Sequence, residues 1–136
     1  MKKYKVLSVR QPYASLLVNG TKDVENRSRY CRYRGTLLIH ASLKEHDVIK
    51  WLREQNEFSS VDIDTMVQMD EVDENNLYGC IIGSVDVVDC VLNSHSEWAN
   101  KGFYHIICTN AKKFKHPIRN VKGKLGIWEW EGEIDE

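Results

Sequence analysis

Hydrophobic positions in this chain gather in short runs, and polar or glycine-containing segments separate the runs. Five of these runs have the β-branched and aromatic content of strands, at 4–9, 35–41, 77–92, 103–109 and 127–131. Gly79 and Gly83 interrupt the longest run, and glycine inside a strand indicates a bulge or a sharp coil. The pattern therefore predicts short, coiled strands of the kind that build a small barrel.

Two segments have the hydrophobic spacing of helices. Pro12 suits the first turn of a short helix that ends at Asn19 and Gly20. The face that this helix buries is predicted to consist of Tyr13, Leu16 and Leu17. Ser42 and Glu45 match a capping box, which opens a second helix through about residue 56.

The segment 59–76 is polar and acidic, and it is predicted to be a helical insertion. Strands that alternate with helices, together with glycine-kinked strands, indicate an α+β fold. We therefore expect a small β-barrel of about five to six strands with flanking helices. A length of 136 residues suits a single domain, which would span residues 1–136.

Charge is distributed unevenly along the chain, although the net charge is only -1. Residues 1–58 carry a net +6, residues 59–100 a net -9 and residues 101–136 a net +2. Basic ends around an acidic middle fit a phosphate-bearing partner, and they fit a dipolar solvated surface equally well. No apolar run approaches the roughly 18 residues that span a bilayer, and the N-terminal segment does not read as a signal peptide. We expect a cytoplasmic protein without a membrane partner.

The cysteines and histidines do not indicate a metal site. The four cysteines lack Cys-x-x-Cys spacing, and the three at 80, 90 and 108 lie in apolar runs, so we expect buried, reduced thiols. The five histidines lack metal-ligand spacing, and His40, in an apolar strand, is expected to be a core residue. No metal and no cofactor are expected.

Polar residues crowd around the first helix, and these residues are Arg10, Gln11, Lys22, Glu25 and Arg27. The segment 22–27 is predicted to be extended, with Glu25 and Arg27 on one side and Val24 on the other. Arginine offers a planar fork for phosphate or a guanine edge, and glutamine can donate and accept at a base edge. Two interpretations remain open: a binding surface, or an ion-pair network that closes the end of the barrel.

Two further clusters combine aromatic side chains with cations. In the first, Lys122 and Lys124 flank Gly123, and Trp128 offers a stacking face. In the second, Trp98 and Tyr104 lie near Lys101, a combination that suits single-stranded nucleic acid. The alternatives are a hairpin turn for the first cluster and core packing for the second.

Four stretches, in their order along the chain, resemble the ASCH (activating signal cointegrator homology) domains of the PUA-like superfamily. The stretches are "LSVRQPYASLLVNGTKDVENR", "YRGTLLIHAS", "GCIIGSVDVVDCV" and "VKGKLGIW". The resemblance implies a PUA-like β-barrel with a polar cleft beside the first helix and an RNA-binding role. It lines that cleft with Arg10, Gln11, Lys22, Glu25, Arg27 and Lys124.

The resemblance also implies that an enzyme is an alternative to a binding module. Some relatives resemble amidohydrolases of acetylated nucleosides that use a lysine, a threonine and a glutamate. Lys22 matches the lysine, Glu25 holds the threonine position, and Asp86 is the only acidic stand-in near the third position. Other relatives resemble ribonucleases, in which Lys22 and Glu25 would be acid and base. A third hypothesis is a protein-interaction domain that uses the acidic segment.

Overall fold

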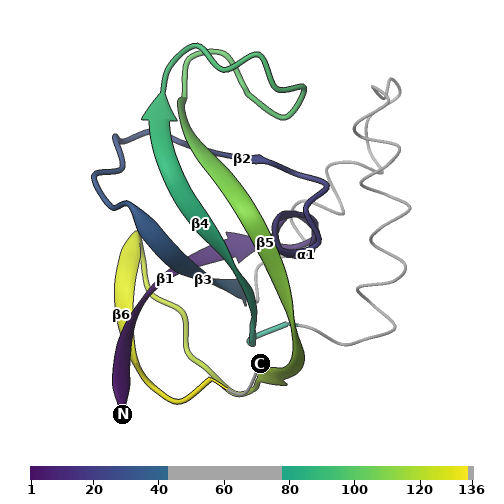
Figure 1. Ribbon diagram of the computed structural model, residues 1–136, viewed down its shortest axis with the longest axis vertical. Helices are drawn as coiled ribbons and strands as arrows, with labels where there is room; N and C mark the ends of the chain where they lie inside the picture. Colours follow the sequence, from purple (N-terminus) through teal and green to yellow (C-terminus); the bar gives the residue numbers. More distant parts are fainter. Residues whose placement is uncertain (43–77, 135–136) are drawn as a thin grey trace.

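The structure, a computed structural model, describes residues 1–42 and 78–134, which form a coiled sheet with one short helix. In chain order the elements are β1 (Lys2–Arg10), α1 (Tyr13–Val18), β2 (Val24–Arg27), β3 (Gly35–Ser42), β4 (Ile81–Val91), β5 (Tyr104–Ile118) and β6 (Ile127–Gly132) (Figure 1). The five predicted strands and the helix after Pro12 are confirmed, although the strand predicted from residue 77 begins at Ile81. The predicted helix to residue 56 and the predicted acidic insertion lie outside the described residues.

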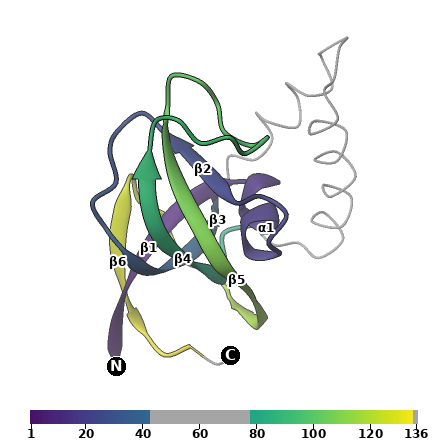
Figure 2. The ribbon, with the colours of Figure 1, turned by 45° about the horizontal axis from the view of Figure 1, so that its top comes forward.

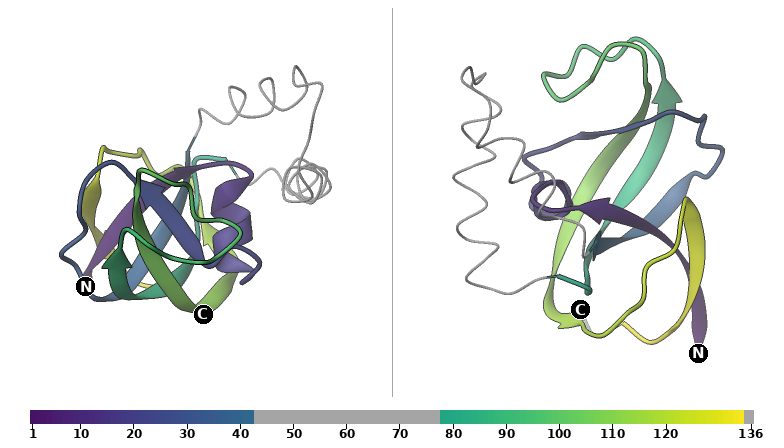
Figure 3. Two further views of the ribbon diagram at one scale, coloured as in Figure 1. Left: turned by 90° about the horizontal axis from the view of Figure 1, so that it is seen from above. Right: turned by 180° about the vertical axis from the view of Figure 1, so that it is seen from behind.

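The six strands form one mixed sheet in the order β2-β5-β4-β3-β1-β6. β1 and β3 are parallel, and the other neighbouring pairs are antiparallel. The sheet coils around the core, as the view from above shows (Figure 3). β2 and β6 are nevertheless the two ends of the ladder, so a fully closed barrel is not confirmed, and α1 is the single helix in the described part.

Core clusters lie on both faces of this sheet and follow the alternation of the strands. On β1, Leu7 and Val9 point into the main cluster, whereas Val6 points into a second cluster with Trp128. α1 packs beside β5 (Figure 2), where Leu17 joins the main cluster. The predicted burial of the cysteines is confirmed, since all four are free and buried. The one helix in the described part is too short to span a membrane.

The predicted irregularity at Gly83 is confirmed, because the register between β4 and β5 shifts between Ile81 and Gly83. β5 is longer than predicted and continues to Ile118 through a segment rich in lysine. Phe114 holds this extension against the second core cluster, at 4% exposure. Packing and pairing with β4 thus outweigh the weak strand propensity of the lysines.

Candidate nucleic-acid interface

Three of the predicted site residues form one ion-pair network at the edge of the sheet. The Lys22 Nζ donates to Glu25 Oε1 at 3.0 Å, and it also donates to the carbonyl of Val24. Arg27 Nε donates to Glu25 Oε2 at 3.0 Å, and Arg27 Nη2 lies 2.8 Å from the same oxygen. Glu25 and Arg27 therefore share one side of β2, as predicted, while Val24 points to the other side, into the cluster with Leu16 and Trp98.

Burial strengthens the interactions between the charges of this network. The side chains of Lys22 and Glu25 are only 5% and 10% exposed, whereas that of Arg27 is 33% exposed. Burial alone would raise the pKa of Glu25, but the charges of Lys22 and Arg27 and their hydrogen bonds outweigh it and lower the pKa. The carboxylate is therefore ionised, and it holds both cations.

Arg27 also connects the two sides of the open sheet. Its Nη2 donates to the backbone carbonyl of Ser8 at 2.9 Å. Ser8 lies on β1 one residue beyond Leu7, where the pairing with β6 stops, so its carbonyl faces the gap between β1 and β2. A side chain thus bridges strands that the backbone ladder does not pair. This is the structural role that the sequence left open for the cluster.

Arg10 and Gln11 differ sharply in exposure. Arg10 is exposed at the end of β1. Gln11 is 0% exposed; its Oε1 accepts from the backbone N–H of Ser15 at 3.0 Å, and its Nε2 donates to Ser15 Oγ at 2.9 Å. Gln11 therefore provides a hydrogen-bond acceptor for a backbone N–H in the first turn of α1. This helix follows Pro12, which is joined to Gln11 by a cis peptide bond. The Gln11 amide lies within the protein and not on the surface.

A chain of hydrogen bonds that the sequence reasoning missed runs beside the network. Ser8 Oγ lies 3.1 Å from His40 Nδ1, and His40 Nε2 lies 2.7 Å from the carbonyl of Val121. A carbonyl only accepts, so Nε2 carries the proton of a neutral ring and Nδ1 accepts from the Ser8 hydroxyl. Trp128 Nε1 in turn donates to Ser8 Oγ at 3.2 Å. In-register pairing of Ser8 with His40 brings the two residues together.

This chain attaches the loop 119–126 to β1 and β3 at Ser8 and His40. A Cβ on Gly123 would come within 2.8 Å of both Ser8 Oγ and His40 Cε1, so only glycine lets the loop approach so closely. Lys124 Nζ lies 6.0 Å from the centre of the Trp128 ring, within the range of a cation–π contact. The structure therefore brings Lys124 and Trp128 close to Ser8, whose backbone carbonyl accepts from Arg27. Lys122 is exposed on the same loop.

The other predicted aromatic residues lie apart from this loop. Trp98 is 7% exposed and packs against Tyr13 at a ring distance of 6.4 Å, in the cluster that also buries Val24. Its carbonyl accepts from Asn26 Nδ2 at 2.9 Å, so Trp98 supports β2 from behind. Tyr104 is half-buried and makes an edge contact with Tyr30. The core-packing alternative describes the position of Trp98.

Asp86 does not join Lys22 and Glu25. It accepts from Thr36 Oγ1 at 3.1 Å and from Asn110 Nδ2 at 2.9 Å, whereas its neighbours Val85 and Val87 point into the core. Cys108 lies on the core side with Glu25: burial, followed by the Glu25 charge, raises the pKa of its thiol to about 12. Asp86 and the ion-pair network therefore lie on opposite faces of the sheet.

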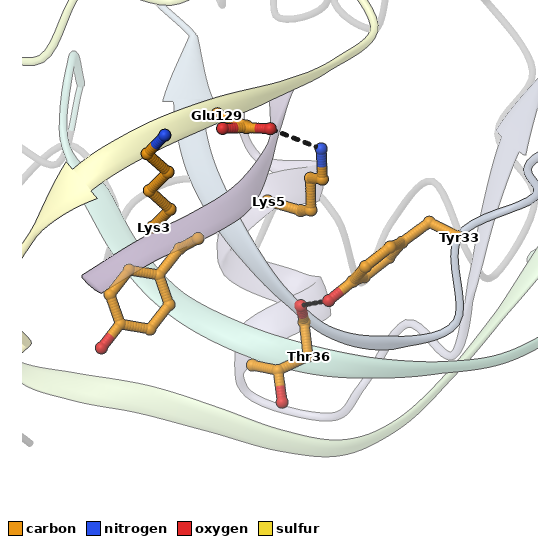
Figure 4. Close-up of a pocket in the computed structure, with 6 residues that line it drawn as sticks. Lys3, Lys5, Tyr33, Thr36 and Glu129 are labelled. Carbon is orange, nitrogen blue, oxygen red and sulfur yellow. Dashed lines mark hydrogen bonds and ion pairs between the residues drawn. The ribbon is translucent and has the colours of Figure 1, made fainter.

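A separate hollow of about 210 Å³ lies at the other end of β1 (Figure 4). Its polar groups are largely engaged: Lys5 Nζ lies 2.9 Å from Glu129 Oε1, and the Tyr33 hydroxyl donates to the Thr36 carbonyl. None of the residues that line it belongs to the predicted site. Within residues 1–42 and 78–134, no cluster of His, Cys, Asp and Glu could hold a metal ion.

His40 is expected to make the fold sensitive to mild acid. Burial lowers the pKa of His40, and the bond to Val121 opposes this only in part. The unfolded chain therefore binds a proton first as the pH falls below the ordinary histidine value of about 6.5. We expect the free energy of unfolding, measured by urea titration, to decrease below this pH in the wild type and to decrease less in His40→Gln.

His116→Gln is the control for this measurement, since His116 is an exposed histidine on β5. It is expected to keep the wild-type dependence on pH. If His40→Gln and His116→Gln gave the same pH profile as the wild type, the buried neutral ring would not be the source of acid sensitivity.

The fold and the buried network define a small β-rich domain with a charged edge beside its helix. The chain belongs to the ASCH domain family, whose model matches residues 7–118. Human activating signal cointegrator 1 is 34% identical over an alignment of 142 positions that covers 96% of this chain and 23% of that protein. The mouse protein of the same name is 33% identical over the same shares. The chain thus spans about a quarter of the length of these relatives.

A solved structure supports the fold independently. The crystal structure of a mutant of ZmASCH, from Zymomonas mobilis, matches with a TM-score of 0.55 over 96% of this chain and 91% of that one. At 12% identity, this likeness concerns the fold alone.

Proposed function

We propose that this ASCH domain binds RNA or a nucleotide at the edge formed by Arg27, Ser8, Lys124 and Trp128. The observation that carries the proposal is the charge of the buried network. Lys22 and Arg27 share the single carboxylate of Glu25, and neither has another carboxylate partner in the described residues. The network thus keeps one excess positive charge where burial limits solvation, and an anionic ligand would neutralise it.

Arg27 is the residue best placed to contact such a ligand. Glu25 and the Ser8 carbonyl occupy its Nε and Nη2, but Nη1 makes no hydrogen bond within the described part of the chain. With 33% of the side chain exposed, Nη1 can donate to a phosphate or a base. Lys124 adds a second charge, and Arg10 lies at the end of the same β1 strand. Phosphate contacts would position the ligand, and base contacts would select it.

The geometry favours binding over hydrolysis. The Lys22 ammonium donates to the Val24 carbonyl and to Glu25, and it lies 5.5 Å from the centre of the Tyr13 ring. The Lys22 side chain is only 5% exposed. A catalytic lysine needs access to the substrate, and Asp86 lies on the other face of β4. We therefore propose that Lys22 and Glu25 orient Arg27 and do not act as acid and base.

Fluorescence anisotropy with labelled single-stranded RNA, and calorimetry with nucleoside monophosphates, test the proposal. We expect Arg27→Gln to weaken binding at least tenfold, because one charge-assisted contact contributes about 1.5–3 kcal/mol. Arg27→Lys should recover only part of the loss, since it keeps the charge without the planar fork. Chromatography of the same mixtures would reveal hydrolysis products.

Arg32→Gln is the matched control, because it removes one exposed arginine charge outside the network. It should bind like the wild type. Thermal melts of each variant separate loss of binding from loss of folding. Failure of the folded wild type to bind either ligand at low salt would refute the proposal, and Lys22-dependent product would replace it with the hydrolase.

A further inference from the structure

The C-terminal part of the chain carries positive charge without interruption. Between residues 101 and 128 there are seven Lys or Arg residues and no Asp or Glu. Six of them lie close together along the second half of β5 and the loop that follows. We name this group the β5 strip, and it consists of Lys112, Lys113, Lys115, Arg119, Lys122 and Lys124.

Within the described residues, the cations of the strip have no carboxylate partner, a property that they share with Lys2, Lys3 and Arg32. All six of its side chains belong to exposed residues. None of them forms an ion pair with a described residue, whereas Lys5, Lys22 and Arg27 do. Exposed like charges that are close together repel one another, so their combined potential attracts an anion.

The backbone places the strip along the second half of β5, with Lys112 on one side of the strand and Lys113 and Lys115 on the other, and then along the loop that follows. Phe114 points into the second core cluster, so Lys113 and Lys115 point to the opposite side of β5, about 6.8 Å apart along the strand. The loop then runs from the end of β5 to the start of β6 (Figure 1). Through Lys124 and its contact with Trp128, this run of charge ends close to Ser8, whose backbone carbonyl accepts from Arg27.

Protection of an open strand edge does not account for the whole strip. Beyond Cys108, β5 pairs only with β4 among the described strands, and lysines on an open edge prevent unwanted pairing between sheets. That role fits Lys112 to Lys115. Arg119, Lys122 and Lys124 lie past the end of the strand, where there is no edge to protect.

We propose that the β5 strip binds the phosphodiester backbone of a nucleic acid strand, one nucleotide of which lies at the Arg27 interface. The inference rests on the proposed function and extends it from a nucleotide to a polymer. A run of exposed lysines, none of which forms an ion pair with a described residue, leads away from the interface and matches the repeated charges of a strand. Lysines hold phosphates as point charges, so this contact is independent of sequence.

The triple variant Lys112→Gln, Lys113→Gln and Lys115→Gln tests the strip. We expect it to bind polyuridylate at least tenfold more weakly than the wild type, with unchanged binding of uridine monophosphate. The slope of log affinity against log salt should decrease by about 2, since each phosphate contact on a single strand contributes about 0.7. Poly(dT) in a parallel titration distinguishes RNA from DNA as the source of the phosphates.

The matched control is Lys2→Gln, Lys3→Gln and Arg32→Gln, which changes the net charge equally at exposed positions outside the strip. It should keep the wild-type slope. An equal loss of polymer affinity in this control, or wild-type polymer affinity in the strip variant, would overturn the proposal for the β5 strip. If Arg27→Gln reduced binding of both ligands and the strip variant reduced neither, the proposal for the β5 strip would be wrong and the proposed function would stand. No polymer or nucleotide binding by the wild type would overturn both.

Discussion

Glu25→Ala is expected to lower the free energy of unfolding by about 3–5 kcal/mol, the cost of leaving buried charge without its partner. Glu25 accepts from both Lys22 and Arg27, and its side chain is 10% exposed. Removal of the carboxylate leaves two cations repelling each other near the core. It also releases the guanidinium that donates to the Ser8 carbonyl. Urea denaturation followed by circular dichroism measures the loss.

Glu129→Ala provides the comparison, because Glu129 also pairs with a lysine, at 2.9 Å, but at a solvent-exposed site where the side chain is 52% exposed. Exposed pairs contribute little, so this variant should unfold at the wild-type denaturant concentration. A double variant, Lys22→Met with Glu25→Leu, should be more stable than Glu25→Ala, since fewer unpaired charges remain. Equal midpoints for Glu25→Ala and Glu129→Ala would show that the network does not hold the sheet together.

This structural role is compatible with binding. Arg27 joins β2 to β1 through one part of its guanidinium, and Nη1 makes no bond within the described residues. Lys22 and Glu25 fix the position of that guanidinium, and under the proposed function a fixed donor would lose little entropy on binding. The sequence pattern allowed a barrel-closing network or a binding surface, and the geometry allows one arginine to do both.

Local patterns predicted the strands and the helix because hydrophobic periodicity and turn residues are read within a few positions. The extension of β5 to Ile118 was missed, since its lysines and Pro117 disfavour a strand and only Phe114 and pairing with β4 hold it. A closed barrel was predicted from the glycines in the strands, but closure depends on whether the two edge strands, β2 and β6, pair with each other. That long-range property is not encoded at single positions.

For the candidate site too, the sequence predicted the residues that are close together along the chain and missed the contact between distant ones. Lys22, Glu25 and Arg27 lie within six residues of sequence, and strand alternation placed two of them together. Ser8 and His40 are 32 residues apart and meet through the parallel register of β1 and β3, which spacing does not reveal. The available signal was a histidine inside an apolar strand, since a buried ring needs a hydrogen-bond partner.

Gly83→Ala is expected to destabilise the domain by about 3 kcal/mol, at the upper end of the range for overpacking. A Cβ at this position would lie 2.2 Å from the Lys112 carbonyl oxygen and 2.8 Å from Val18 Cβ. Neither atom is the end of a flexible side chain, so β5 and α1 would both have to move away from Gly83 on β4. Both elements support the interface, because β5 pairs with β2 and α1 precedes Lys22.

Gly126→Ala separates this steric effect from the general cost of replacing glycine. Gly126 has a φ of +66°, and a Cβ there would meet no atom within 4 Å beyond its chain neighbours, so only backbone strain of about 1–2 kcal/mol opposes alanine. Thermal and urea denaturation should therefore rank Gly83→Ala as clearly less stable than Gly126→Ala. The opposite ranking would mean that β5 moves away from β4 at little cost. In that case the register shift at Gly83 would not require glycine, and the path of β5 from the interface to the β5 strip would be set by Phe114 and its core contacts instead.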